Sequence, residues 1–133
     1  RAGSERVLEL HGSVLRNFCM DCGAAYPVDE LLRLRDEAAD GVPRCPACGG
    51  IVKPDVVLYE EALDERTLQG SVDAIAHADL LVVAGTSLSV YPAAGLIDFF
   101  QGDHLVIVNR TPTPRDRQAD LCIAANVGEV FGF

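Results

Sequence analysis

Residues 80–87 read Leu-Leu-Val-Val-Ala-Gly-Thr-Ser, an apolar run that ends in a glycine and two hydroxyl side chains. A second apolar run occupies residues 105–108, and residues 121–124 predict a third strand. Helical patterns precede the first run and separate it from the second. Uniformly apolar strands that alternate with helices predict a parallel sheet covered on both faces, and therefore a doubly wound α/β fold.

The predicted helices begin with recognisable signals. Residues 64–78 predict a helix that starts at Asp64, because an aspartate at the N-cap accepts a hydrogen bond from the first turn. Residues 92–100 predict a second helix, with Pro92 in its first turn. Residues 28–39 carry leucines and a valine among charges at helical spacing, which predicts a third.

The segments before residue 60 are less regular. Residues 14–18 predict an extended strand, and residues 51–59 predict another that Pro54 interrupts. Proline lacks a backbone N–H, so this second segment is expected to be an edge strand or a loop. Ser4–Leu10 has the pattern of the end of an amphipathic helix. Since the chain also lacks an initiator methionine, we expect it to be a piece of a longer protein.

Two cysteine pairs, Cys19-Met-Asp-Cys22 and Cys45-Pro-Ala-Cys48, predict a metal site. Thiolates two residues apart on a tight turn bind one tetrahedral Zn²⁺, and two such turns complete a four-thiolate site. A pair of disulfides or four unrelated buried thiols are the alternatives. The segment 19–52 has few apolar residues, so zinc would supply folding free energy on the order of 10 kcal/mol.

Composition narrows the class of protein. The 133 residues are enough for one ordinary domain with its own core. The net charge of −9 disfavours binding to nucleic acid, and no apolar run reaches the roughly 18 residues that span a membrane. Metal-type cysteine spacing and an unpaired fifth thiol, Cys122, favour a reducing, cytoplasmic location. Cys122 itself is expected to be a small buried hydrophobe.

Three short segments carry candidate chemistry. Gly85-Thr86-Ser87 ends a predicted strand, where backbone N–H groups and hydroxyls bind anions, and Asn109 ends the next, where a carboxamide could hydrogen-bond a ribose. His11 stands beside Gly12 and suits a general base. Each signal alone is weak. Gly-Thr-Ser and Asn109 are also common turn chemistry, and neither forms a GxGxxG fingerprint.

The order of the motifs is more specific than any one of them. Leu10-His11-Gly12-Ser13 precedes the two cysteine pairs, and Val-Lys-Pro-Asp-Val-Val-Leu-Tyr-Glu follows at 52–60. Residues 85–94 then read Gly-Thr-Ser-Leu-Ser-Val-Tyr-Pro-Ala-Ala, and Val-Ile-Val-Asn stands at 106–109. In this order the segments closely resemble the sirtuin family of NAD-dependent protein lysine deacylases, nearly from end to end.

The resemblance implies a fold and a reaction. Residues 1–18 and 53–133 would be part of a Rossmann-like NAD-binding domain, and residues 19–52 a small module with a structural zinc. NAD⁺ and an acyl-lysine peptide would meet in the cleft between them. Nicotinamide would leave as the acyl oxygen attacks the ribose, and the products would be free lysine, nicotinamide and an O-acyl-ADP-ribose.

The resemblance also implies roles for individual residues. His11 matches the base that activates a ribose hydroxyl, and Val57 and Tyr59 match the strand that pairs with the substrate. The positions that match NAD contacts are Gly85, Thr86, Ser87, Asn109, Arg110 and Val127. The positions that match the zinc ligands are Cys19, Cys22, Cys45 and Cys48.

Two departures from the family qualify these expectations. Glu60 stands where the family usually has glycine, which leaves the preference for peptide sequence open. The family's N-terminal half, with its glycine-rich turn and nicotinamide-pocket strand, has no counterpart here, so we expect little activity from these residues alone. Two alternatives remain: a non-enzymatic zinc-ribbon interaction module, and an NAD-dependent protein ADP-ribosyltransferase.

Overall fold

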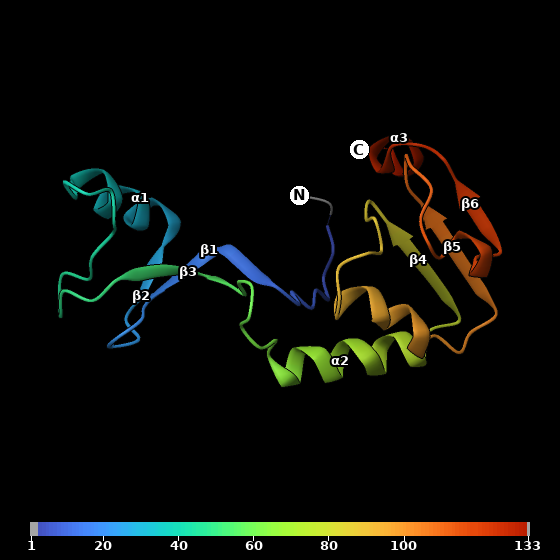
Figure 1. The fold of residues 1–133 in the computed structure, drawn as a ribbon, viewed down its shortest axis with the longest axis horizontal. Helices are drawn as coiled ribbons and strands as arrows, with labels where there is room; N and C mark the ends of the chain where they lie inside the picture. Colours follow the sequence, from blue (N-terminus) through green and yellow to red (C-terminus); the bar gives the residue numbers. More distant parts are fainter. Residues whose placement is uncertain (1–2, 133) are drawn as a thin grey trace. The chain divides into compact units, whose positions relative to one another are not determined.

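The computed structural model describes residues 3–132, which form two compact units (Figure 1). One unit combines the residues up to Leu10 with those from Asp64 onward, and the other spans His11–Leu63. The latter contains the expected module 19–52 and extends beyond it at both ends, because the strands that flank the cysteine pairs hydrogen-bond to each other. None of the described helices has the length and apolar character needed to cross a membrane.

The unit His11–Leu63 is an antiparallel sheet with one helix. Its elements are β1 (Gly12–Cys19), β2 (Ala25–Pro27), α1 (Val28–Glu37) and β3 (Val52–Val56). The strand order is β2-β1-β3, and Asn17 of β1 pairs with Tyr26 on one side and Pro54 on the other. The buried core consists of Cys19, Leu34, Cys45 and Val52. Two of these four core residues, Cys19 and Cys45, also belong to the candidate metal cluster. The core of the unit and the cluster therefore share side chains.

The position of β3 confirms the prediction from Pro54. β3 is an edge strand of its sheet, and its outer edge has no strand partner among residues 3–132. A proline is tolerated there because the ladder does not require its missing N–H. The helix predicted over 28–39 is also confirmed, as α1 covers Val28–Glu37.

The other unit contains a parallel sheet. Its elements are α2 (Glu65–Ala76), β4 (Leu80–Ala84), the 3₁₀ helix η1 (Ala93–Phe99), β5 (His104–Val108), the 3₁₀ helix η2 (Asp116–Gln118), β6 (Leu121–Ile123) and α3 (Val127–Phe131). The order is β4-β5-β6, with Val83 beside Ile107 and Ile107 beside Cys122. The predicted α/β fold with a parallel sheet is therefore confirmed.

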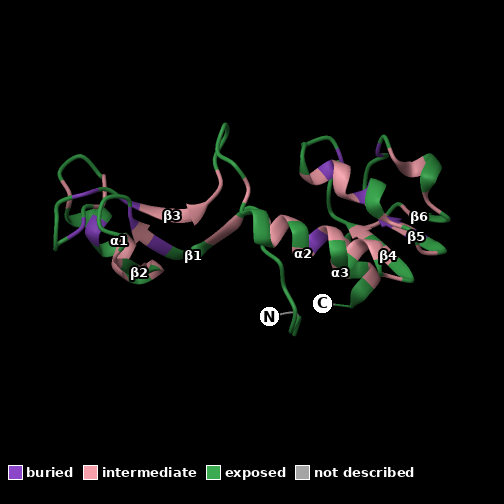
Figure 2. Cartoon of the chain, turned by 90° about the horizontal axis from the view of Figure 1, so that it is seen from below, coloured by how far each residue is buried: buried purple, intermediate pink, exposed green. Residues whose placement is uncertain are grey.

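Within the described residues the central strand, β5, is buried on both faces near its end, because Val108, on the face opposite Leu105 and Ile107, is 1% exposed. Leu105 and Ile107 of β5 are 6% and 2% exposed, and they pack with Leu88 and Ile97. On β4 exposure alternates along the strand (Figure 2). Leu80, at the start of β4, keeps 53% of its surface exposed. The expected coverage of both faces is therefore incomplete at β4 among the described residues, because strand composition shows what a strand could bury but not what lies against it.

Two other local expectations need correction. Ser4–Leu10 is not helical. The N–H of Leu10 donates to the Leu8 carbonyl at 3.1 Å, and Leu8 lies against α2, where a Cβ added to Gly70 would be 3.6 Å from Leu8 Cδ1. The apolar residues of this segment therefore do not form a helix. Leu8 instead packs against α2. The segment 92–100 is helical but of the 3₁₀ type, with Pro92 preceding η1.

Asp64 caps α2 as predicted. Its Oδ1 accepts hydrogen bonds from the backbone N–H and the hydroxyl of Thr67, both at 2.8 Å. Replacing it with alanine leaves first-turn N–H groups without a side-chain acceptor. We expect Asp64→Ala to lower the melting temperature of the chain by about 5 °C and Asp64→Asn to lower it much less. Equal melting curves for Asp64→Ala and the unmodified chain would show that the cap does not stabilise α2.

Candidate metal centre and nucleotide site

The four predicted zinc ligands gather in one cluster. The sulfurs of Cys19, Cys22, Cys45 and Cys48 all lie within 4.8 Å of one another. Sγ of Cys19 is 3.4 Å from Sγ of Cys48, and Sγ of Cys22 is 3.6 Å from Sγ of Cys45. A tetrahedral zinc with Zn–S bonds of about 2.3 Å places its sulfurs roughly 3.8 Å apart. These distances suit four ligands of one ion and are far longer than the roughly 2.05 Å of a disulfide.

Each cysteine pair is shaped by a tight turn that ends in glycine. The N–H of Gly23 donates to the Cys19 carbonyl at 3.0 Å, and the N–H of Gly49 donates to the Cys45 carbonyl at 2.8 Å. Gly23 and Gly49 have φ values of +72° and +78°, which glycine adopts without steric cost. The turns therefore hold both thiols of each pair on the same side of the chain, as a shared metal requires.

The charge of four crowded sulfurs favours a cation at the cluster. The backbone N–H of Gly50 lowers the pKa of the Cys48 thiol, but the sulfurs of the other three cysteines together raise it to about 12. The protonated Cys48 thiol can donate to these sulfurs, whereas a Cys48 thiolate cannot, and burial adds to the effect. A divalent cation at the centre instead stabilises the deprotonated sulfurs by binding them. The donor set and its spacing thus fit structural zinc.

Cys45 differs from the other ligands because a phenol lies beside it. The hydroxyl of Tyr26 is 3.0 Å from Cys45 Sγ. The Tyr26 hydrogen bond lowers the pKa of Cys45 to about 6, and the same contact raises the pKa of Tyr26 to about 12. Tyr26 was not predictable from the sequence, because its only signal is its place four residues after Cys22.

A hollow of about 460 Å³ lies beyond the carboxyl ends of β4 and β5. The N–H of Gly85 donates to the Val108 carbonyl at 3.0 Å, and the N–H of Asn109 donates to the Ile123 carbonyl at 3.1 Å. Both residues therefore follow directly from paired strands, at the edge where open parallel sheets bind ligands. The residues that line the hollow are Gly85, Asn109, Arg110, Ala125, Asn126, Val127 and Gly128.

The structure thus brings together four of the six residues expected to contact NAD. Gly85 has a φ of +65°, and a Cβ added to it would lie 3.4 Å from Val127 Cγ2. A glycine here keeps the strand end and the start of α3 close while leaving the hollow open. Thr86 and Ser87 are not among the lining residues. Their hydroxyls bond locally, Thr86 Oγ1 to the N–H of Leu88 and Ser87 Oγ to Ser89 Oγ.

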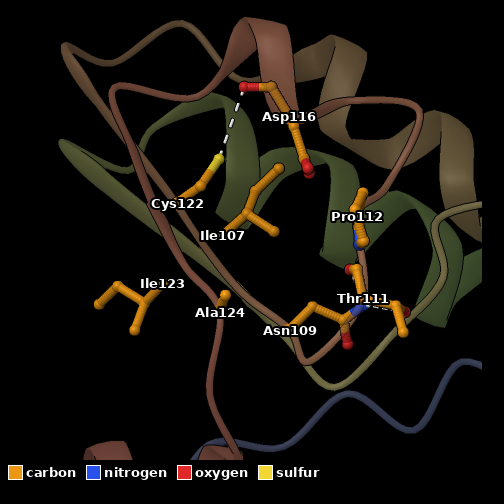
Figure 3. Close-up of a pocket in the computed structure, with 8 residues that line it drawn as sticks. All are labelled: Ile107, Asn109, Thr111, Pro112, Asp116, Cys122, Ile123 and Ala124. Carbon is orange, nitrogen blue, oxygen red and sulfur yellow. Dashed lines mark hydrogen bonds between the residues drawn. The ribbon is translucent and has the colours of Figure 1, made fainter.

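Asn109 has a defined side-chain orientation. Its Nδ2 donates to the Thr111 carbonyl at 2.9 Å, which leaves Oδ1 as an acceptor without a partner among the described residues. Asn109 also borders a second hollow of about 80 Å³ (Figure 3). There Cys122 Sγ lies 3.6 Å from the Asp116 carbonyl oxygen. Cys122 is exposed, so its expected burial is wrong, because β6 is an edge strand.

His11 belongs to the other unit, where it precedes β1. Its side chain is exposed, and its carbonyl accepts a hydrogen bond from the N–H of Val57 at 3.1 Å. Gly12 follows with a φ of +75°, and a Cβ there would overlap the Asp55 carbonyl oxygen. Glycine therefore permits the close approach of β1 and β3 that places His11 beside Val57, one of the two expected substrate-strand residues.

Comparison with known proteins identifies the family. A scan against protein-family models matches the Sir2 family over residues 1–92 of the 133. The chain belongs to the Sir2 family. Among curated Sir2 relatives, an NAD-dependent protein deacetylase of Clostridium perfringens is 55% identical over 98% of this chain and 52% of its own length. This Sir2 chain therefore spans about half the length of the curated relatives it matches.

Solved Sir2 structures share its fold. A Sir2 complex with a p53 peptide and NAD⁺ superimposes with a TM-score of 0.91 at 36% identity, over 99% of this chain and 55% of that one. A Sir2 bound to a propionylated peptide gives a TM-score of 0.91 at 36% identity, over 99% of this chain and 56% of that one. The sirtuin resemblance seen in the sequence is confirmed.

The expected substrate strand of this Sir2 chain ends in an unusual turn. Tyr59 is 97% exposed, and Glu60 adopts a φ of +69°, a left-handed conformation that costs a non-glycine residue roughly 1–2 kcal/mol. Glu61 holds the turn, accepting from the N–H of Leu58 at 2.8 Å and from Lys53 Nζ at 2.9 Å. A glycine, which the sirtuin resemblance implies at this position, would adopt the left-handed conformation without that cost. Glu60 adopts the same conformation here.

Three residues that line the hollow beyond β4 and β5 were not predicted from the sequence. Ala125, Asn126 and Gly128 surround Val127 there, and Asn126 is the N-cap of α3. The available signal was Asn126 itself, two residues after the predicted strand 121–124, because asparagine is common at a helix N-cap.

Proposed function

We propose that the whole protein is an NAD-dependent protein lysine deacylase, to which this chain contributes part of the nucleotide site, the zinc-stabilised unit and the substrate strand. The hollow beyond β4 and β5 carries the proposal, because it gathers Gly85, Asn109, Arg110 and Val127 in a Sir2-family chain. The names of the relatives, NAD-dependent protein deacetylases, support the same reaction.

The lining residues fit the adenosine part of a dinucleotide. Asn109 Oδ1 would accept a hydrogen bond from a ribose hydroxyl, and Arg110 adds positive charge suited to phosphate. Gly85 would let a ligand approach the backbone closely. When bound, NAD⁺ supplies the ribose carbon that accepts the acyl group as nicotinamide leaves. The residues that line the hollow would position that nucleotide. His11 would act as the general base and accept a proton from a ribose hydroxyl.

The acyl-lysine substrate would pair with β3. The outer edge of β3 has no strand partner among residues 3–132, and an extended peptide can add to such an edge through backbone hydrogen bonds. Val57 and the exposed Tyr59 follow directly from this strand. Solved Sir2 proteins with acetylated or propionylated peptides support an acyl-lysine peptide as the substrate class.

Residues 1–133 alone are proposed to turn over little or no substrate, because the matched relatives are about twice as long. Assays of catalysis therefore need the full-length protein that carries this sequence. The free thiols, including the exposed Cys122, suit a reducing compartment, and we propose the cytoplasm.

Asn109→Ala tests the nucleotide site. The substitution removes the proposed ribose acceptor but leaves the strand hydrogen bond from the Asn109 N–H to Ile123. Loss of a hydrogen bond between neutral groups predicts that the KM for NAD⁺ rises about 3- to 10-fold while the KM for the peptide stays unchanged. Nicotinamide release by the full-length protein with an acetylated peptide measures both constants.

The matched control is Gln101→Ala, an exposed residue in the loop between η1 and β5. It should leave both KM values unchanged. A folded Asn109→Ala variant with an unaltered KM for NAD⁺ would show that the hollow beyond β4 and β5 does not bind the nucleotide.

A further inference from the structure

Tyr26 contacts the metal cluster with its hydroxyl group. Its phenol oxygen lies 3.0 Å from Cys45 Sγ, well within the reach of a hydrogen bond to sulfur. Among residues 3–132, Tyr26 is the one residue other than cysteine whose side chain hydrogen-bonds a cluster sulfur. A thiolate has no hydrogen to give, so with metal bound the phenol O–H must be the donor.

Three features fix the position of Tyr26. Its backbone pairs with Asn17 in the β1–β2 ladder, and Asn17 Nδ2 also donates to the Tyr26 carbonyl at 3.2 Å. Asn17 is 2% exposed, so this second bond is sheltered from solvent. The Tyr26 ring packs against the buried cluster that contains Cys45. These contacts hold the hydroxyl at the sulfur in the folded unit.

The contact makes the four sulfurs unequal. Cys45 is 2% exposed, and its sulfur lies 3.0 Å from the Tyr26 hydroxyl. Cys22 and Cys48 are exposed, and neither receives a side-chain O–H bond among the described residues. Donation to a thiolate withdraws electron density from sulfur, which makes it less nucleophilic toward protons and electrophiles while it stays bound to the metal.

We propose that Tyr26 is a positioning residue of the zinc site, whose hydroxyl holds Cys45 in its ligand orientation and strengthens binding of the metal. This role does not depend on the deacylase reaction, because it concerns only the unit His11–Leu63.

Tyr26→Phe removes the hydroxyl and keeps the ring in the core. Loss of a hydrogen-bond partner of a metal ligand predicts a zinc affinity about 10- to 100-fold weaker. Competition with a chromophoric chelator on the 133-residue chain measures this affinity. Tyr59→Phe is the matched control, because Tyr59 is in the same unit but 97% exposed, and its zinc affinity should be unchanged.

A spectroscopic readout separates the hydrogen bond from packing. With Co²⁺ in place of Zn²⁺, loss of donation to sulfur should move the sulfur-to-metal charge-transfer band to lower energy in Tyr26→Phe. Leu31→Ala loosens the same core without removing a bond to sulfur, and its band should not move. An unshifted band or an unchanged zinc affinity in Tyr26→Phe would overturn the proposal, as would the same band shift in Leu31→Ala.

Discussion

Chelation of zinc is expected to unfold the unit His11–Leu63. Two of the four buried core residues of this unit, Cys19 and Cys45, are also metal ligands, so removing the ion removes the centre of its core. Structural zinc contributes folding free energy on the order of 10 kcal/mol, more than so small a core supplies alone. Hydrogen exchange followed by mass spectrometry should show loss of protection in β1, α1 and β3.

Serine substitutions provide matched variants of this experiment. Cys45→Ser should reproduce the effect of the chelator in the presence of zinc, because it removes one ligand of four. Cys122→Ser is the control, since Cys122 lies on β6 outside the cluster, and it should bind one zinc and keep full protection. Unchanged protection of residues 11–63 after complete removal of the metal would show that zinc does not hold this unit together.

His11→Ala in the full-length protein is expected to lower kcat by about 10²- to 10⁴-fold, the usual contribution of a general base. The backbone bond between His11 and Val57 survives the substitution, and the side chain is exposed, so the fold should persist. The KM for NAD⁺ should change little, because the proposed nucleotide contacts lie elsewhere in the chain.

His77→Ala is the control for this prediction. His77 is the C-cap of α2, where its Nδ1 lies 2.8 Å from the Asp73 carbonyl oxygen, and its loss should leave kcat unchanged. A folded His11→Ala variant with a normal kcat would exclude His11 as the base. An equal loss in both variants would point to a general effect of removing an imidazole.

The local elements were predictable where short-range chemistry determines them. Asp64 marks the start of α2 because capping needs only the first turn, and Pro54 marks an edge because it lacks an N–H. The packing of the parallel sheet was not predictable in the same way. Leu80 is apolar yet exposed, since burial depends on what lies against the strand rather than on the strand itself.

The candidate sites show the same difference between features that local sequence determines and features that depend on tertiary packing. The cysteine spacing predicted the metal cluster because each pair is a local turn, and the pairs meet through the pairing of β1 with β3. The contact between Tyr26 and Cys45 depends on the tertiary arrangement of β2 with the second turn, for which the sequence carries no periodic signal. Thr86 and Ser87 stay predicted nucleotide contacts, and in this structure their hydroxyls bond within their own loop.

The stoichiometry of products tests the deacylase proposal most directly. The full-length protein, supplied with NAD⁺ and an acetylated lysine peptide, should form nicotinamide, deacylated peptide and O-acetyl-ADP-ribose in equal amounts, measured together by mass spectrometry. Nicotinamide should not form from the unacetylated peptide. Release of free acetate without nicotinamide, or ADP-ribose attached to protein as the main product, would contradict the account.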